Sequence, residues 1–218
     1  TLALAEALAD LEQDVHVWTL ARGGDAGFFR PVAPEVRVHA VPFEAVDGEP
    51  VGARIVRSID VLAEGLAEGL ANGLGGLGGV VHAQDCISAN AALRRARGVV
   101  RTIHHLDRFT TPELAACHER AIVEPVAHVC VSAAVASELR AGWGIEAAVI
   151  PNGVEAERFV AAAEDGAARA AWAAKLGRYV VAVGGIEPRK GSADLIEAMA
   201  LVQRADPSLR LVVAGGET

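Results

Sequence analysis

Residues 98–132, GVVRTIHHLDRFTTPELAACHERAIVEPVAHVCVS, contain the pattern that decides the fold. Apolar runs at 98–106 and 127–132 are each short enough to form one strand, and we expect a helix between them at 112–123. Nearly continuous Val and Ile runs separated by helices are typical of parallel strands that are covered on both faces. This segment therefore predicts a strand, a helix and a second, parallel strand.

The same alternation continues on both sides of this segment. Leu4, Leu8 and Leu11 recur at helical spacing near the N-terminus, and alternating apolar residues follow them. The predicted fold class is α/β, a doubly wound parallel-sheet Rossmann-like domain whose ligands lie beyond the carboxyl ends of the strands. The further expected strands cover 14–20, 35–41, 80–85 and 146–151, and the further helices cover 1–12, 86–97 and 133–141.

A leucine repeat occupies residues 62–77, where Leu62, Leu66, Leu70 and Leu74 stand four residues apart. Four-residue spacing places these leucines on one face of a helix. Each glycine between them costs about 1 kcal/mol relative to alanine. We therefore expect a weak surface helix that ends near Gly73 in a glycine-rich segment.

A turn signal at 151–159, PNGVEAERF, interrupts the alternation. We expect no regular structure from there until a helix at 164–176, and we place a domain boundary after residue 151. Residues 1–151 then form a Rossmann-like domain without its N-terminal strand, and residues 152–218 begin a second one. The further elements expected in the second are a strand at 179–185, a helix at 191–205 and a strand from 209. Because one strand pair and two helices cannot close a core of this type, we expect the chain to be incomplete.

Composition and charge argue against several classes of protein. The net charge of −8 disfavours broad nucleic-acid binding, and we expect Arg94, Arg95, Arg97 and Arg101 to solvate one helix end. No stretch of about 18 uncharged apolar residues occurs, so we expect no transmembrane segment. The 3 cysteines are odd in number and lack C-x-x-C spacing, which favours reduced thiols and a cytoplasmic location.

The stretch GGIEPRKGSADLIEAM at 184–199 joins a predicted strand to a predicted helix. Its glycine spacing matches neither the P-loop nor the dinucleotide-binding fingerprint. Glycines nevertheless let the backbone approach a ligand closely, and a helix N-terminus directs N–H groups at an anion. Arg189 can hold a phosphate through two hydrogen bonds, Lys190 adds a compact charge, and we expect Ser192 to cap the helix. The turn is therefore either an anion site or a solvated basic loop.

Read with PNGVEAERF, VVHAQDCISAN (80–90) and VRTIHHLD (100–107), this turn resembles the motifs of GT4-type retaining glycosyltransferases. The resemblance covers nearly the whole chain and implies a GT-B fold, in which two Rossmann-like domains face each other across a cleft. It implies that residues 1–151 form the acceptor-side domain and that 152–218 begin the nucleotide-sugar donor-binding domain. It also implies hexosyl transfer with retention of the anomeric configuration.

The resemblance assigns the donor-binding residues. The family's pattern after the first strand of the second domain is Gly-Arg, a few residues, and then Lys-Gly. Gly184 and the Lys190–Gly191 pair match this pattern, whereas Gly185 stands where the family has Arg. We expect Arg189 to supply the guanidinium from four residues further on. Cations and backbone N–H groups here would stabilise the charge that develops on a departing diphosphate.

The resemblance also points to residues in the first domain. His104 matches the family's cleft histidine and is the expected catalytic residue, because a neutral imidazole can donate to a sugar hydroxyl or accept its proton. Asp85 and His105 are the expected acceptor-side residues, although His105 stands where many relatives carry Asp. The alternatives are that both histidines only satisfy loop backbone and that Asp85 caps the following helix. We expect His82 to be a satisfied core histidine.

The residue spacings disfavour a metal site, since neither short zinc-ligand spacing nor a D-x-D motif occurs. We expect no cofactor other than a nucleotide-diphosphate-sugar co-substrate, and a small-molecule, glycan or lipid acceptor as its partner. Peripheral membrane contact and oligomeric state are left open. The family's paired glutamates near the donor sugar are missing from these 218 residues, so we expect the chain alone to be inactive. The alternative is a non-catalytic α/β module for nucleotide or phosphate binding, or for assembly.

Overall fold

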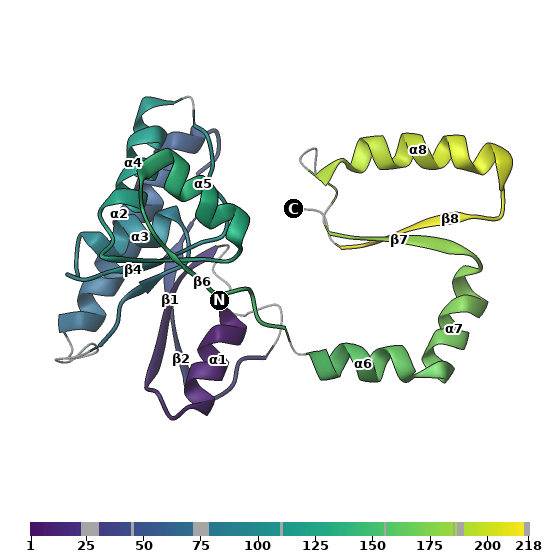
Figure 1. Ribbon diagram of the computed structural model, residues 1–218, viewed down its shortest axis with the longest axis horizontal. Helices are drawn as coiled ribbons and strands as arrows, with labels where there is room; N and C mark the ends of the chain where they lie inside the picture. Colours follow the sequence, from purple (N-terminus) through teal and green to yellow (C-terminus); the bar gives the residue numbers. More distant parts are fainter. Residues whose placement is uncertain are drawn as a thin grey trace. The chain divides into compact units, whose positions relative to one another are not determined.

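The computed structural model describes residues 1–22, 31–44, 46–71, 79–109, 111–154, 156–184, 186 and 190–215. It divides into two compact units, Thr1–Val154 and Glu155–Thr218, which are described separately. Figure 1 shows the order of helices and strands along the chain.

The first unit contains two parallel sheets. Strand β1 (Val15–Arg22) pairs with β2 (Val36–Phe43) over their whole length. The second sheet has four strands in the order of the sequence: β3 (His82–Ala83), β4 (Val100–Ile103), β5 (Ala127–Cys130) and β6 (Ala148–Val149). The predicted α/β class with parallel strands is confirmed, although most of these strands are shorter than the sequence indicated.

Three helices connect the strands of the four-stranded sheet: α3 (Cys86–Leu93), α4 (Pro112–Val123) and α5 (Ala133–Trp143). Parallel neighbours joined in sequence order require crossovers of one hand, which places these helices on the same face of the sheet. The bounds of α4 are those that the sequence predicts. Helix α5 begins at the Ser132 cap, whose hydroxyl accepts from the Val135 N–H, and ends at Gly144 with φ of 67°.

The β1–β2 sheet has a helix on each face. Helix α1 (Leu2–Asp10) contacts both strands, and the Glu6 carboxylate accepts a 3.2 Å hydrogen bond from the Ala33 N–H just before β2. Helix α2 (Val51–Ala71) contacts both strands as well and also lies against α3. This helix therefore lies between the β1–β2 sheet and the helical layer of the four-stranded sheet.

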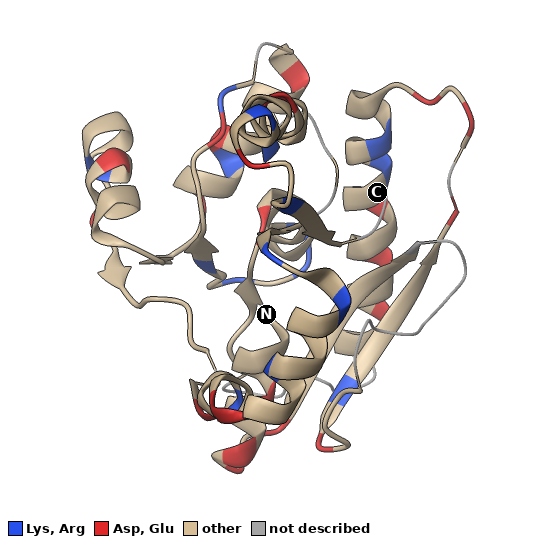
Figure 2. Cartoon of the chain, turned by 90° about the vertical axis from the view of Figure 1, so that its right-hand side faces the viewer, with Lys and Arg blue, Asp and Glu red and all other residues tan. Residues whose placement is uncertain are grey.

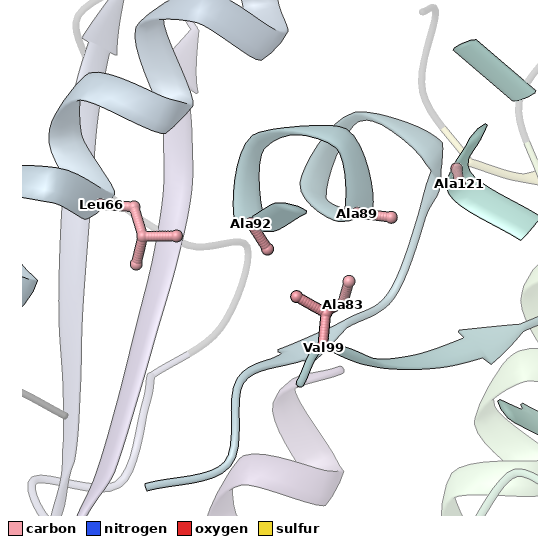
Figure 3. Packing of buried hydrophobic residues seen from close by; sticks show 6 residues of the cluster. All are labelled: Leu66, Ala83, Ala89, Ala92, Val99 and Ala121. Carbon is pink, nitrogen blue, oxygen red and sulfur yellow. The ribbon is translucent and has the colours of Figure 1, made fainter. Parts of the chain in front are cut away.

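The leucine repeat is helical as predicted, but the prediction that its helix is a weak one at the surface was wrong. Helix α2 spans Val51–Ala71 and begins well before Leu62, while Gly73 and Leu74 lie outside the described residues. Ile59, Leu62 and Leu66 are buried. Figure 3 shows Leu66 near Ala92 of α3, in a cluster that also contains Ala83, Ala89, Val99 and Ala121. Helix α2 is a central part of the core.

Two glycines in α2 allow its close approach to the strands. A Cβ atom added at Gly65 would lie 2.5 Å from Val41 Cγ2, and one added at Gly69 would lie 2.5 Å from Trp18 Cζ2. Both distances are far below van der Waals contact. These glycines lower the helix propensity of α2, but they allow the helix to pack closely against β1 and β2.

The prediction that Arg94, Arg95, Arg97 and Arg101 solvate one helix end holds for the first three, which are exposed residues that follow α3. The Arg94 guanidinium pairs with Asp60 of α2, and Arg95 Nε donates to the Ala63 carbonyl at 3.1 Å. Arg101 lies in β4 and is only 4% exposed. Arg94 and Arg95 therefore also attach α3 to α2, and the prediction was wrong for Arg101, which enters the core.

The second unit contains α6 (Ala156–Glu164), α7 (Gly166–Leu176), β7 (Tyr179–Val183), α8 (Ser192–Ala205) and β8 (Arg210–Ala214). Strands β7 and β8 are parallel, as α8 between them requires. The expectation that no regular structure precedes residue 164 was wrong, because α6 occupies that stretch. Met199 is the buried hydrophobic residue in the described part of this unit.

Charged residues of both signs, the apolar character of the helices and the cysteines can be followed through the described residues. In Figure 2 Lys and Arg residues are interspersed with Asp and Glu. Among the described residues, no helix combines the length and apolar character needed to cross a bilayer. All three cysteines are free thiols.

The close approach of α2 predicts opposite effects for glycines within the same helix. Gly65→Ala or Gly69→Ala should lower the free energy of unfolding by about 1–3 kcal/mol, because the new methyl group overpacks the contact with Val41 or Trp18. Gly52→Ala is the control, since its Cβ would meet nothing within 4 Å and should leave stability unchanged or up to about 1 kcal/mol higher. Urea unfolding followed by circular dichroism measures all three. Equal effects at the three positions would contradict this packing.

Candidate functional site at the carboxyl edge of strands β3 and β4

The polar residues of interest follow two neighbouring parallel strands. Gln84 and Asp85 come directly after β3, and His104 and His105 come directly after β4. The carboxyl ends of paired parallel strands meet at one edge of the sheet, which is where open α/β sheets bind ligands. The structure thus brings three of the predicted residues, Asp85, His104 and His105, to the same edge.

A chain of hydrogen bonds links side chains from both strands. His104 Nε2 lies 3.2 Å from Gln84 Oε1, and Gln84 Nε2 lies 3.2 Å from His82 Nε2. His82 Nε2 lies 2.7 Å from the Thr102 hydroxyl. Side chains alternate between the faces of a strand, so these four share one face, while Ala83 and Ile103 point to the other. We call this group the histidine–glutamine chain.

The other face of the sheet carries the core. Ala83 and Ile103 are buried in clusters that include residues of α3, α4 and α5. The histidine–glutamine chain therefore rests on a packed layer but lies on the opposite side of the sheet from it. His82, which we expected to be a core histidine, has its hydrogen-bond partners but is an exposed residue.

Both histidines in the chain favour the neutral form. Desolvation lowers the pKa of His104, and repulsion from His105 and Arg101 lowers it further, while Asp85 opposes the shift. Desolvation also lowers the pKa of His82, with a smaller contribution from His104. A neutral imidazole has one donor nitrogen and one acceptor nitrogen, which general acid–base chemistry requires.

Asp85 has a structural task at the start of α3. Its Oδ1 accepts a 2.7 Å hydrogen bond from the Ser88 N–H, while Ser88 Oγ accepts from the Asp85 N–H at 3.0 Å. This reciprocal pair is a capping box, which satisfies orphan N–H groups of the first helical turn. The cap is the alternative that the sequence left open, and a role of Asp85 toward an acceptor stays a prediction.

His105 differs from its neighbour in exposure. Its side chain is 73% exposed, and Nε2 lies 3.2 Å from Asp107 Oδ2. A contact in such an exposed position contributes little to stability. His105 is therefore accessible to a ligand, and its acceptor-side role also stays a prediction.

Sequence reasoning missed a buried polar group under this edge. Arg101 Nη1 donates to the Ala121 carbonyl at 3.2 Å, and its Nε has no hydrogen-bond partner in the described part of the chain. Asn90 Nδ2 donates to the carbonyls of Cys86 and Cys117 at 2.9 Å and 2.8 Å, joining α3 to α4. The sequence signal for the burial of Arg101 was its position within an otherwise apolar strand, but we interpreted Arg101 as part of a surface cluster.

The predicted donor turn is described only in part. Gly185 and Arg189 lie outside the described residues. Gly184 has φ of 136° and Gly191 has φ of 67°, which are backbone conformations that residues other than glycine rarely adopt. Gly191, and not Ser192 as we expected, is the N-cap of α8, with Ser192 as the first helical residue. Lys190 is exposed beside this helix start, and Asp194 lies in the first turn.

Comparison with known proteins identifies the family. The model of Glycosyltransferase Family 4 matches residues 1–158. The chain belongs to this family. Its relatives include the phosphatidyl-myo-inositol mannosyltransferases of Mycobacterium tuberculosis and Mycobacterium bovis, which are 34% identical over 132 residues.

The match to these relatives is partial. It covers 57% of this chain and 32% of each relative, so the chain spans about a third of the length of the proteins it matches. The family match covers the whole first unit, including the edge that carries His104. The comparisons support glycosyl transfer as the general activity of the family to which this unit belongs.

Histidine burial predicts how stability depends on pH. Desolvation lowers the pKa values of His39, His82, His104 and His118 in the folded state. As pH falls below the unfolded value of about 6.5, the unfolded chain binds protons that the folded chain does not. The free energy of unfolding should therefore decrease between about pH 7.5 and about pH 5.5, as measured by urea unfolding.

A variant pair tests the origin of this dependence. His118 is 6% exposed and both of its ring nitrogens lack a hydrogen-bond partner among the described residues, so His118→Phe should flatten the pH profile. His105→Gln, at an exposed position, is the control and should leave the profile in place. A profile that is flat in the unmodified protein, or unchanged in His118→Phe, would contradict the account.

Proposed function

We propose that this chain is part of an enzyme that transfers a hexosyl group from a nucleotide-diphosphate-sugar to an acceptor hydroxyl. The observation that carries the proposal is the position of His104, a half-buried histidine with a lowered pKa at the carboxyl edge of β4, within a Glycosyltransferase Family 4 match. His104 is the residue that the family resemblance assigns to the cleft. Retention of the anomeric configuration belongs to the same proposal.

The donor end of the reaction needs stabilisation of negative charge. When the bond between sugar and phosphate breaks, charge develops on the departing diphosphate, and groups placed to meet it lower the barrier. The first-turn N–H groups of α8 and the Lys190 ammonium are the described groups of this kind. Gly184 and Gly191 keep the backbone beside them free of side chains, and Gly185 and Arg189 remain proposed members of the site.

The acceptor end needs a group that handles a hydroxyl proton. His104 can accept that proton or donate a hydrogen bond to a sugar hydroxyl while it remains neutral. Asp85 and His105, on the same edge, are proposed to hold other hydroxyl groups of the acceptor. The names of these relatives refer to mannosyl transfer and phosphatidyl-myo-inositol, so we propose a polyol, free or as a lipid headgroup, as the acceptor class.

The second unit has consequences for activity and location. Its described strands and helices expose many large apolar residues and bury Met199, so we propose that the 218 residues alone do not transfer sugar.

The free cysteines and the sugar-nucleotide donor are both compatible with our proposal of a cytoplasmic enzyme.

A lysine substitution tests the donor site in the intact enzyme. Lys190→Ala should lower kcat on the order of 10²-fold, because one cation that meets the leaving diphosphate is removed. Lys175→Ala is the control, since this exposed lysine lies 5.1 Å from the Trp172 ring centre in α7, outside the proposed site. Activity is measured as release of nucleoside diphosphate from GDP-mannose and UDP-glucose, each with myo-inositol or phosphatidylinositol vesicles. Full turnover in Lys190→Ala would contradict the donor site, and no transfer by the unmodified enzyme with any pair would favour a non-catalytic binding module.

A further inference from the structure

Gln84, which the proposed mechanism does not use, lies between two histidines. Its side chain is half-buried just after β3, with Oε1 3.2 Å from His104 Nε2 and Nε2 3.2 Å from His82 Nε2. A primary amide has one acceptor end and one donor end, so it imposes opposite roles on the two nitrogens that it contacts. Gln84 therefore couples the proton positions of the two histidines.

The Thr102 hydroxyl determines the direction of this coupling. Thr102 is 6% exposed, and within the described residues the hydrogen-bond partner of its hydroxyl is His82 Nε2, at 2.7 Å. A buried hydroxyl that leaves its proton unpaired loses about 1–3 kcal/mol, so the hydroxyl donates to His82 Nε2. That nitrogen is then an acceptor, and it also accepts from the Gln84 amide N–H. The amide oxygen consequently faces His104 Nε2, which must donate to it.

We propose that Gln84 is a positioning residue that holds His104 with its proton on Nε2, which leaves Nδ1 as the acceptor for a substrate hydroxyl. The inference rests on the proposed role of His104 and names the residues that prepare it: Gln84, His82 and Thr102. The two histidines are held in opposite tautomers, with the proton on Nε2 of His104 and on Nδ1 of His82. A hydrogen bond to the second nitrogen is the usual means by which a protein fixes the reactive nitrogen of a histidine.

The charges around His104 favour this neutral state. His105 and Arg101 oppose a positive charge on the ring, as does its desolvation, and Asp85 supports one. The Asp85 Oδ1 atom, however, already accepts from the Ser88 N–H in the cap of α3. A neutral ring without the contact to Gln84 would exchange between both tautomers, so only part of the molecules would offer Nδ1 as an acceptor.

Nuclear magnetic resonance of the 218-residue chain with ¹⁵N-labelled histidine tests the assignment without any substrate. Long-range proton–nitrogen spectra show which ring nitrogen carries the proton. We expect Nε2–H for His104 and Nδ1–H for His82 in the unmodified chain at neutral pH. The opposite pair of tautomers would mean that the amide is reversed and would overturn the proposal.

Two substitutions separate positioning from packing. Gln84→Leu should leave His104 as an exchanging mixture of tautomers, whereas Gln84→Glu should keep Nε2–H and raise the pKa of His104, because a carboxylate stabilises the imidazolium. Gln13→Leu is the control and should change neither, because Gln13 is exposed and its side-chain amide donates to the Leu11 carbonyl of its own loop. Thermal unfolding checks that each variant is folded.

The outcomes distinguish this inference from the proposed function. Unchanged tautomers in Gln84→Leu would overturn the positioning role even if the intact enzyme transfers sugar. The expected tautomers together with no sugar transfer by the intact enzyme would leave Gln84 as the residue that orients His104 and would reject glycosyl transfer instead.

Discussion

The close contact between α2 and the β1–β2 sheet is the constraint on which the first unit depends. Gly65 and Gly69 bring the helix backbone against Val41 and Trp18, at distances that no side chain would allow. The same helix contributes Leu66 to the cluster with Ala83 and Ala89. One helix therefore joins the two parallel sheets into a single core. Interiors packed this densely leave little room for the strands to shift.

This packing determines where the proposed chemistry lies. With α3 and α4 held against one face of the four-stranded sheet, the carboxyl ends of β3 and β4 present their polar residues on the other face. Asp85 starts α3 through its capping box, so the residue next to it, Gln84, has a defined position between His82 and His104. His104, which the family resemblance assigns to the cleft, thus contacts Gln84, a residue that lies between the end of β3 and the Asp85 cap of α3.

The sequence predicted those features that depend on local pattern. The alternation of apolar runs and helices was sufficient for the α/β class, the parallel strands and the bounds of α4, because strand and helix periodicity reflect burial directly. It was also sufficient to place His104 at a strand end. Gln84 was not recognised, since its importance comes from pairing across β3 and β4, and side-chain pairing depends on register that one sequence does not show.

The errors have physical causes as well. The leucine repeat was interpreted as a surface helix because propensity counts each glycine as a cost, whereas tertiary contact at Gly65 and Gly69 makes the small residue necessary. Arg101 was grouped with its neighbours in sequence, although strand alternation turns it into the core. Ser192 was preferred as a cap by residue type, but the positive φ of Gly191 places the helix start one residue earlier.

The central claim is that the turn before α8 holds the leaving diphosphate of an activated sugar. A crystal structure of the intact enzyme with a bound nucleoside diphosphate tests it most directly. The account predicts phosphate oxygens within about 2.7–3.2 Å of first-turn N–H groups of α8, with the Lys190 ammonium beside them. A diphosphate bound at another place, with Lys190 and the start of α8 exposed to solvent, would contradict it.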